Sequence, residues 1–345
     1  MFRLIFLAST LLLIALGGGH ADAAPAVRPR VVIAVDGVEQ PRNLPALLAE
    51  RLGYFRDAGL TVTLVDAPAD PSPAKLMADG RADGAVAYFH HTFMSQVEDG
   101  SVTRSVVLLG VTPGERLMVS TRLQGRVHSV RDLKGPKIIT GGPNSGKTSA
   151  TTWAFLHAGL NAHDYVSMPL VPRDAAAKEL AAGIADAIMA HEPDASFYEK
   201  SGAAFELLDM ATPADTRAAL GTIYPSTVLY MPVGFISAHS QQVRALVSAL
   251  LRSLEFIETH DAKAIAAVLP AKMIGADRNA FLTHLAADKE MFGGDGHMDA
   301  AAAEGELRAM TAFNPTYGRV RIAETWSNEF LDTSGTSNRR PTKGR

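Results

Sequence analysis

Short apolar runs alternate with helical patterns along much of the chain. Residues 31–35 read Val-Val-Ile-Ala-Val, which predicts a buried strand, and the leucines that follow recur at helical spacing as far as Phe55. Strand patterns return at 61–65 and 85–88, with a short helical pattern at 74–79 between them. The order strand, helix, strand, helix, strand is typical of a parallel sheet with right-handed crossovers.

The same order returns later in the chain. Residues 55–60, Phe-Arg-Asp-Ala-Gly-Leu, match residues 155–160, Phe-Leu-His-Ala-Gly-Leu, and residues 80–87 match residues 183–190. The offsets of 100 and 103 residues are nearly equal, which indicates an internal repeat. The second copy has strand patterns at 137–140, 165–170 and 187–190 and helical patterns at 148–157 and 175–182. Two such units predict an α/β protein of two lobes, each built on a parallel-rich sheet that is flanked by helices.

In open α/β sheets, ligands bind outside the carboxyl ends of the strands. Four loops of this chain follow predicted strands at that position. They are residues 37–43, 88–92, 141–148 and 191–194. If the lobes face each other, the four loops converge on one cleft. Their candidate ligand-binding residues are Gln40, Asn43, Tyr88, His90, His91, Thr92, Asn144, Ser145, Gly146, Lys147, Thr148, His191, Glu192 and Asp194.

Composition and charge exclude several other functions. The 345 residues are 47% hydrophobic and 20% charged, which is typical of a globular protein. The net charge of −3 gives no basic field for nucleic acid. The chain has no cysteine, so disulfides, thiolate metal sites and a cysteine nucleophile are all excluded.

The two ends of the chain differ from the rest. Arg3, an apolar run over 4–16 and the small residues around 21–23 predict a cleavable signal peptide over residues 1–23. The run is short for a membrane span, so we expect export of a soluble, monomeric protein to the periplasm. Residues 334–345 hold four basic side chains and no apolar period, and we expect a disordered tail there.

The loop at 141–148 fits the nucleotide-binding pattern G-x-x-x-x-G-K-[ST] between a strand and a helix. A Gly-rich turn at a helix N-terminus presents backbone N–H groups to an anion of any kind, and Lys147 adds a positive charge. In the alternative, structural interpretation, Asn144 or Ser145 caps the helix. An exported chain does not meet ATP, and the acids of the fourth loop lack the apolar run that precedes a Mg²⁺-holding acid. We therefore expect an anion site rather than a nucleotidase.

Histidines are the other reactive side chains of these loops. His90, His91 and His191 with Glu192 resemble a zinc ligand set. Adjacent residues of an extended loop point in opposite directions, however, so hydrogen bonding to a ligand is favoured over metal binding. No Gly-x-Ser-x-Gly elbow accompanies the serines. We expect a binding protein and not an enzyme, with neither a metal nor another cofactor.

Several sequence segments, taken in order along the chain, resemble those of the periplasmic substrate-binding proteins of ABC importers. The nearest group is the nitrate, sulfonate and taurine binders, with their relatives in thiamine-pyrimidine synthesis. The segments are residues 44–60, Tyr88 to Thr92 with Gln96 and Gly100, residues 132–135, 224–232, 291–298, 312–315 and 327–330. The resemblance covers roughly residues 30–332.

This resemblance implies a two-lobed periplasmic-binding-protein fold of type II, with a small-molecule ligand clamped between the lobes. It implies lobe I at 24–113 plus 228–333 and lobe II at 114–227. The partners would be a permease of the inner membrane and its cytoplasmic ATPase. Lys147 favours a small anionic solute, sulfonate-, taurine- or nitrate-like, whereas Tyr88 and Tyr224 could stack on a pyrimidine.

Other functions stay open at this stage. One is a thiamine-pyrimidine-related binding protein or enzyme, and another is a P-loop nucleotide-binding enzyme. A third is the ligand-binding partner of a signalling receptor, because the same fold can serve either transport or sensing.

The signal-peptide interpretation makes a prediction about processing. Cleavage after Ala23 should leave a mature chain that begins near Ala24. Amino-terminal sequencing of the exported protein measures this directly. Recovery of residues 1–23 in a membrane fraction would contradict it.

Overall fold

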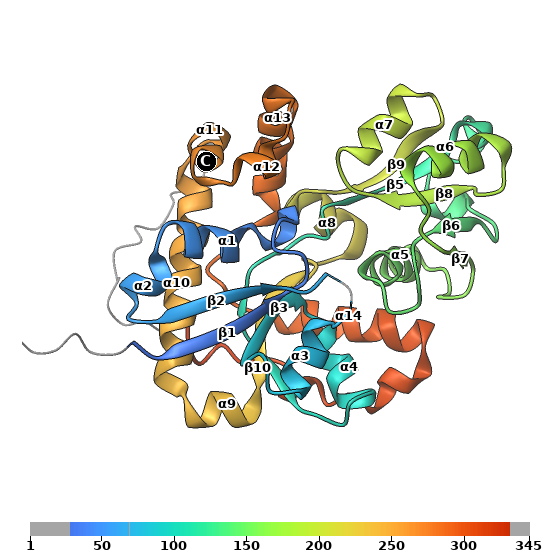
Figure 1. The fold of residues 1–345 in the computed structure, drawn as a ribbon. Helices are drawn as coiled ribbons and strands as arrows, with labels where there is room; N and C mark the ends of the chain where they lie inside the picture. Colours follow the sequence, from blue (N-terminus) through green and yellow to red (C-terminus); the bar gives the residue numbers. More distant parts are fainter. Residues whose placement is uncertain (1–27, 69, 332–345) are drawn as a thin grey trace, which may run out of the picture.

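The computed structural model describes residues 28–68 and 70–331. The predicted signal peptide and the predicted basic tail lie outside these residues. Two five-stranded sheets organise the chain, and they lie in separate halves of the molecule (Figure 1). We call the half that contains the first sheet lobe I and the other half lobe II.

The sheet of lobe I has the strand order β2-β1-β3-β10-β4. Strands β1, β2 and β3 are parallel, and β10 runs antiparallel to both of its neighbours. The strands are β1 (Arg30–Val35), β2 (Thr61–Asp66), β3 (Gly84–Tyr88), β4 (Thr103–Leu108) and β10 (Thr227–Pro232).

The sheet of lobe II repeats this plan, with the order β7-β6-β8-β5-β9. Strands β6, β7 and β8 are parallel, and β5 runs antiparallel to both of its neighbours. The strands are β5 (Glu115–Ser120), β6 (Lys137–Ile139), β7 (Val166–Met168), β8 (Ala187–Ala190) and β9 (Ala204–Met210). The internal repeat and the two-lobed α/β fold that were predicted from the sequence are thereby confirmed.

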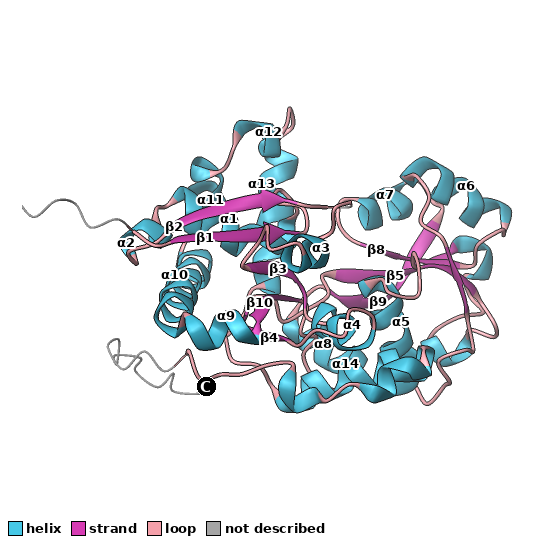
Figure 2. Ribbon diagram, turned by 60° about the horizontal axis from the view of Figure 1, so that its bottom comes forward, coloured by secondary structure: helices cyan, strands magenta, loops and turns pink. Residues whose placement is uncertain are grey.

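Helices cover both faces of each sheet (Figure 2). In lobe I they are α1 (Leu44–Arg51), α2 (Tyr54–Asp57), α3 (Pro73–Ala78), α4 (His91–Val97), α9 (Val233–Ala238), α10 (Ser240–Thr259), α11 (Ala262–Val268), α12 (Ala271–Ile274) and α13 (Arg278–Asp288). In lobe II they are α5 (Gly146–His157), α6 (Arg173–Ala182), α7 (Asp194–Lys200) and α8 (Pro213–Leu220). Short 3₁₀ turns occur at Pro41–Asn43, Thr121–Leu123, Val130–Asp132, Lys289–Met291, Pro315–Arg319 and Ile322–Glu324.

The single helical pattern that ends at Phe55 is in fact two helices. Gly53 has a left-handed backbone, with φ of 73°, and this ends α1 before α2 begins. Glycine adopts this conformation without the steric cost that other residues pay.

The chain crosses between the lobes at two adjacent places. Residues 109–114 lead from β4 to β5, and residues 221–226 lead back to β10. The two crossings are joined by backbone hydrogen bonds, from Tyr224 N to Val111 O at 3.0 Å and from Ser226 N to Gly110 O at 3.0 Å.

One further helix, α14 (Ala300–Phe313), packs on both lobes. Ala302 and Ala303 belong to a core cluster of lobe I, whereas Ala309 belongs to a core cluster of lobe II. In Figure 1 this helix runs beneath α5. The sequence patterns considered above did not include this helix.

The contact between α14 and α5 predicts an effect of one added methyl group. A Cβ atom at Gly305 would overlap the Trp153 ring of α5. Gly305→Ala should therefore lower the free energy of unfolding by about 1–3 kcal/mol, the usual cost of overpacking. Urea denaturation measures it.

Gly234→Ala is the matched control, since Gly234 also lies in a helix but has open space around its Cα. It should be neutral or should gain up to about 1 kcal/mol from helix propensity. Equal effects of the two substitutions would contradict the close packing of α14 on α5.

Candidate functional site

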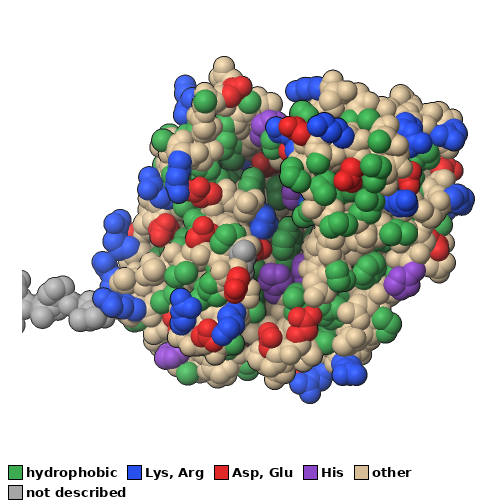
Figure 3. Space-filling view, turned by 45° about the vertical axis from the view of Figure 1, so that its right-hand side comes forward, with side chains coloured by type: hydrophobic (Ala, Val, Ile, Leu, Met, Phe, Trp, Pro, Cys, Tyr) green, Lys and Arg blue, Asp and Glu red, His purple; other side chains and the backbone are tan. Residues whose placement is uncertain are grey.

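A furrow separates the two lobes, and histidine, lysine and arginine side chains lie along it (Figure 3). The four loops at the carboxyl ends of β1, β3, β6 and β8 reach this furrow, two from each lobe. Direct contacts join the loops across it. Tyr88 packs on the backbone of Gly146, so a Cβ atom there would lie 3.1 Å from its ring. Tyr317 Oη lies 3.0 Å from Asn144 Oδ1 and 3.1 Å from Glu98 Oε1, so its single proton can be donated to either oxygen.

The loop after β1 is held in shape by its own side chains. Asn43 is fully buried, and its Nδ2 donates to the carbonyl oxygens of Asp36 at 2.7 Å and Gly37 at 2.8 Å. Arg42 Nη2 donates to the Asp36 carboxylate at 3.0 Å, while its guanidinium lies 5.0 Å from the centre of the Tyr88 ring. Gln40 is exposed. Of the residues in this loop, Arg42 contacts the loop after β3, although it was not among the candidates from the sequence.

The loop after β3 forms an aromatic cluster. The rings of Tyr88 and His90 stack at 5.3 Å, and the His90 and His91 rings meet edge to face at 5.0 Å. Burial raises the pKa of Tyr88 to about 12 and lowers the pKa of His90 to about 4 and that of His91 to about 3. These three groups are therefore uncharged at neutral pH. Thr92 is buried and its hydroxyl donates to the Phe89 carbonyl at 2.9 Å, within lobe I.

The Gly-rich loop after β6 is capped by its own residues. Ser145 is the N-cap of α5, and its Oγ accepts from the backbone N–H groups of Lys147 at 3.1 Å and Thr148 at 3.4 Å. The Thr148 hydroxyl donates to the Gly142 carbonyl at 2.7 Å. The strand and helix around the nucleotide-binding pattern are present, but these donors of the turn already have intramolecular acceptors.

The loop after β8 contributes one residue to the centre of the furrow. His191 Nδ1 lies 3.3 Å from the Gly114 carbonyl oxygen. Burial and, after it, the charge of Lys147 lower the pKa of His191 to about 4. Glu192 forms an ion pair with Arg116, and Asp194 lies 3.6 Å from Arg173 at the start of α7.

Glu115 joins the third and fourth loops and was missed by the sequence analysis. It is the first residue of β5 and is 1% exposed. Its Oε1 lies 3.3 Å from Lys147 Nζ and 3.3 Å from His191 Nε2. The positive charge of Lys147 is thus paired within the furrow. The sequence did contain a signal for this residue, namely an acidic residue at the start of a buried strand, directly after Gly114.

A second buried acid lies on α14. Glu306 is fully buried, and its Oε1 is 3.2 Å from His90 Nδ1. Burial raises the pKa of Glu306 well above its ordinary value. A protonated carboxyl can donate to the neutral imidazole, so this is a hydrogen bond between uncharged groups. Tyr224 is also fully buried, and its hydroxyl donates to the Gly146 carbonyl at 3.4 Å.

No group of three or more histidine, cysteine, aspartate or glutamate side chains is suitably placed for a metal ion within residues 28–68 and 70–331. The same part of the chain contains no helix that is both long enough and apolar enough to cross a membrane.

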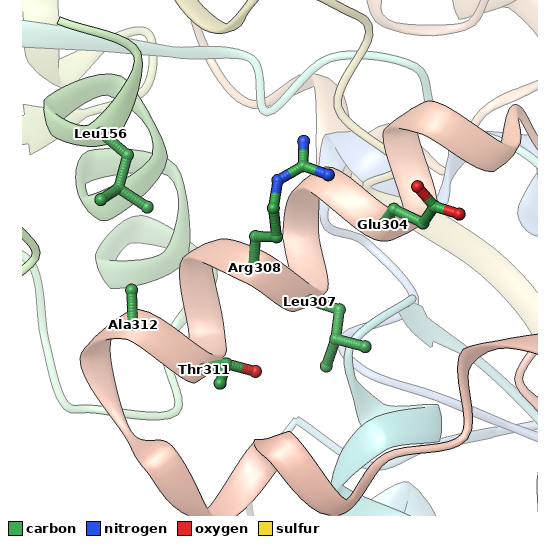
Figure 4. A pocket seen from close by; sticks show the side chains of 6 residues that line it. All are labelled: Leu156, Glu304, Leu307, Arg308, Thr311 and Ala312. Atoms are coloured by element: carbon green, nitrogen blue, oxygen red, sulfur yellow. The ribbon is translucent and has the colours of Figure 1, made fainter. Parts of the chain in front are cut away.

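Two cavities lie outside the centre of the furrow. One, of about 250 Å³, lies between the lobes and is lined by Glu39, Pro41, Leu44, Glu192, Pro193, Met273, Phe281, His284, Leu285 and Asp288. Burial and, after it, the charge of Glu192 raise the pKa of Asp288 to about 6. The other, of about 600 Å³, lies between α5 and α14, with Leu156, Leu307, Arg308 and Ala312 on its walls (Figure 4). None of the candidate ligand-binding residues lines this second cavity.

The two lobes, the double crossing and the furrow define a periplasmic-binding-protein fold. The chain belongs to the family described as NMT1/THI5 like, whose family model matches residues 40–264, more than half of the chain. This confirms the resemblance that was inferred from the sequence.

Two solved structures share this fold. A structure of a protein from Bordetella bronchiseptica RB50 is 29% identical, with a TM-score of 0.71, and the match covers 88% of this chain and 96% of that one. The periplasmic aliphatic sulphonate binding protein SsuA from Escherichia coli is 18% identical, with a TM-score of 0.65 over 88% of this chain and 100% of that one.

A curated relative from Saccharomyces cerevisiae is named 4-amino-5-hydroxymethyl-2-methylpyrimidine phosphate synthase THI11. It is 25% identical over 229 residues, which are 65% of this chain. The chain spans only 66% of the length of this relative.

The neutral state of Glu306 predicts a pH effect on stability. Above the ordinary glutamate pKa the unfolded chain loses this proton while the native protein keeps it, so the free energy of unfolding falls as pH rises through that range. Glu306→Gln removes this effect and should be more stable, relative to the parent protein, at pH 8 than at pH 4.

Chemical denaturation at the two pH values measures the difference. Glu304→Gln is the matched control, because Glu304 is exposed on the same helix, and it should not change with pH in this way. A Glu306→Gln difference that is the same at both pH values would show that the carboxyl is ionised in the native protein.

Proposed function

We propose that the protein is the periplasmic solute-binding component of an ABC importer. It captures a small solute between its two lobes and delivers it to a permease of the inner membrane. The observation that supports this most strongly is the convergence of four loops, from the carboxyl ends of parallel strands in both lobes, on one furrow. Ligands of open α/β sheets bind at that position.

The solute class that we propose is a small organic acid, such as a sulfonate. Arg42 and Lys147 supply positive charge at the furrow, from the first and third loops. Tyr88 and His91 supply aromatic surface. The name of the E. coli neighbour, a sulphonate binding protein, supports the same class.

Closure about the crossings is the proposed mechanism. Residues 109–114 and 221–226 lie side by side and would act as the hinge, while α14, which packs on both lobes, would limit how far lobe II at 114–227 turns. Hinge closure around a ligand is common in two-lobed proteins. The contact of Tyr88 with Gly146 and that of Tyr317 with Asn144 would then open and re-form in each cycle.

A second candidate function is binding or conversion of a thiamine-related pyrimidine. The yeast relative named as a pyrimidine phosphate synthase supports it. Tyr88, which stacks on His90, supplies aromatic surface beside the furrow, whereas Tyr224 is fully buried in the core of lobe II. Release of unchanged ligand would favour transport, and turnover would favour an enzyme.

Nucleotide hydrolysis has less support. Ser145 Oγ already accepts from two N–H groups of the Gly-rich turn, and Lys147 is paired with Glu115. A P-loop uses the backbone N–H groups of this turn and the lysine to bind the phosphates of the nucleotide.

Mass spectrometry of small molecules released from the denatured protein identifies the solute. Small-angle scattering with that compound then tests closure. The radius of gyration should fall at saturation because the two lobes move closer together. An analogue that does not bind serves as the control. A radius that stays constant at saturating solute would contradict clamping between the lobes.

A further inference from the structure

Glu115 lies where the four loops meet. Lys147 of the third loop and His191 of the fourth are each 3.3 Å from its Oε1. Burial raises the pKa of Tyr88, in the second loop, and by itself lowers that of Arg42, in the first, while the charge of Glu115 adds a smaller upward effect to both. Lys147 and His191 therefore contact this carboxylate directly, and Arg42 and Tyr88 lie within reach of its charge.

The two oxygens of this carboxylate differ in their surroundings. Oε1 faces Lys147 and His191, whereas Oε2 is buried and has no hydrogen-bond partner in the part of the chain that the structure describes. Native proteins pair the large majority of buried acceptors, and an unpaired one is costly. A solute that brings an N–H donor to Oε2 removes this cost.

The charges around the furrow favour the same kind of solute. Lys147 is paired with Glu115, and Arg42 with Asp36 at 3.0 Å. A simple anion gains less from cations that are already paired, and a buried carboxylate repels it. Arg42 Nε, in turn, is a buried donor without a partner among the described residues. Among the described residues the site thus leaves one buried acceptor and one buried donor unpaired, and a solute would reach them when the lobes open.

We propose that Glu115 is the specificity-determining residue of the furrow and selects solutes that carry an N–H donor. The donor is an ammonium or an amino group on a ring, and it lies beside an acidic or hydrogen-bond-accepting group. Simple anions such as nitrate, and organic acids without an amine, are discriminated against. This inference rests on the proposed function, because it places the solute in the furrow.

Matched pairs of compounds that differ by one amino group test the inference. The pairs are 2-aminoethanesulfonate with ethanesulfonate, 4-aminobutanoate with butanoate, and 4-amino-2-methylpyrimidine with 2-methylpyrimidine, and nitrate is the simple anion. Titration calorimetry of the full mature chain gives each affinity. In at least one pair the amine should bind about 10- to 150-fold more tightly, as expected for a hydrogen bond to a charged group.

Glu115→Gln should abolish that preference, because the neutral amide presents a weaker acceptor and no charge. The amine-bearing compound should lose about 10- to 150-fold in affinity, while the amine-free compound and nitrate should not weaken. Glu258→Gln, an exposed acid on α10, is the control and should bind like the parent protein. If Glu115→Gln fails to fold, the parent protein still provides a test. The absence of any preference for the amine-bearing compound in all three pairs would overturn the inference.

The outcomes separate this inference from the proposed function. Amine-free compounds or nitrate that bind as tightly as the amines would overturn the role of Glu115 but would leave a solute-binding protein. An amine preference that survives Glu115→Gln would also overturn that role. A protein that binds none of the compounds would contradict both this inference and the organic-acid class that we propose.

Discussion

The packing of α14 against both lobes is the constraint on which the rest of the structure depends. Two lobes with separate cores that are joined only by two short crossings would be free to change their relative orientation. Helix α14 restricts this freedom, since Ala302 and Ala303 pack in one core and Ala309 in the other. Its single buried acid, Glu306, can lie there only as a neutral group, because an unpaired charge is too costly at such a position. The hydrogen bond to His90 links this helix to the loop that carries the aromatic cluster of the furrow.

Electrostatics within the furrow follow from the same burial. The histidines of the four loops are neutral, since burial lowers the pKa values of His90, His91 and His191. The charges that persist are paired, Arg42 with Asp36 within the first loop and Lys147 of the third loop with Glu115 of β5. Discrimination between solutes therefore depends on which single atoms lack a partner rather than on net charge.

The fold was predictable because its signals are local and repeated. The strand and helix patterns of 31–88 return over 137–190, and topology then places the four loops at one edge.

The site was less predictable. The position of Lys147 followed from its motif, but its partner Glu115 lies 32 residues earlier and on the strand that enters the second lobe. Likewise, no sequence pattern connects Glu306 with His90, whose separation is 216 residues. Contacts of this kind depend on tertiary packing, which periodicity does not encode.

The adjacent crossings have a consequence for the history of the chain. Because residues 110 and 226 are joined by a backbone hydrogen bond, lobe II enters and leaves lobe I at one point, as an inserted domain does. Duplication of one α/β unit followed by insertion into its own copy would produce this arrangement together with the internal repeat. Exchange of such a module between relatives is nevertheless restricted. A transplanted lobe II would leave behind the alanine face of α14 and expose Trp153 and Tyr165 to water, so the module and its helix must be inherited together.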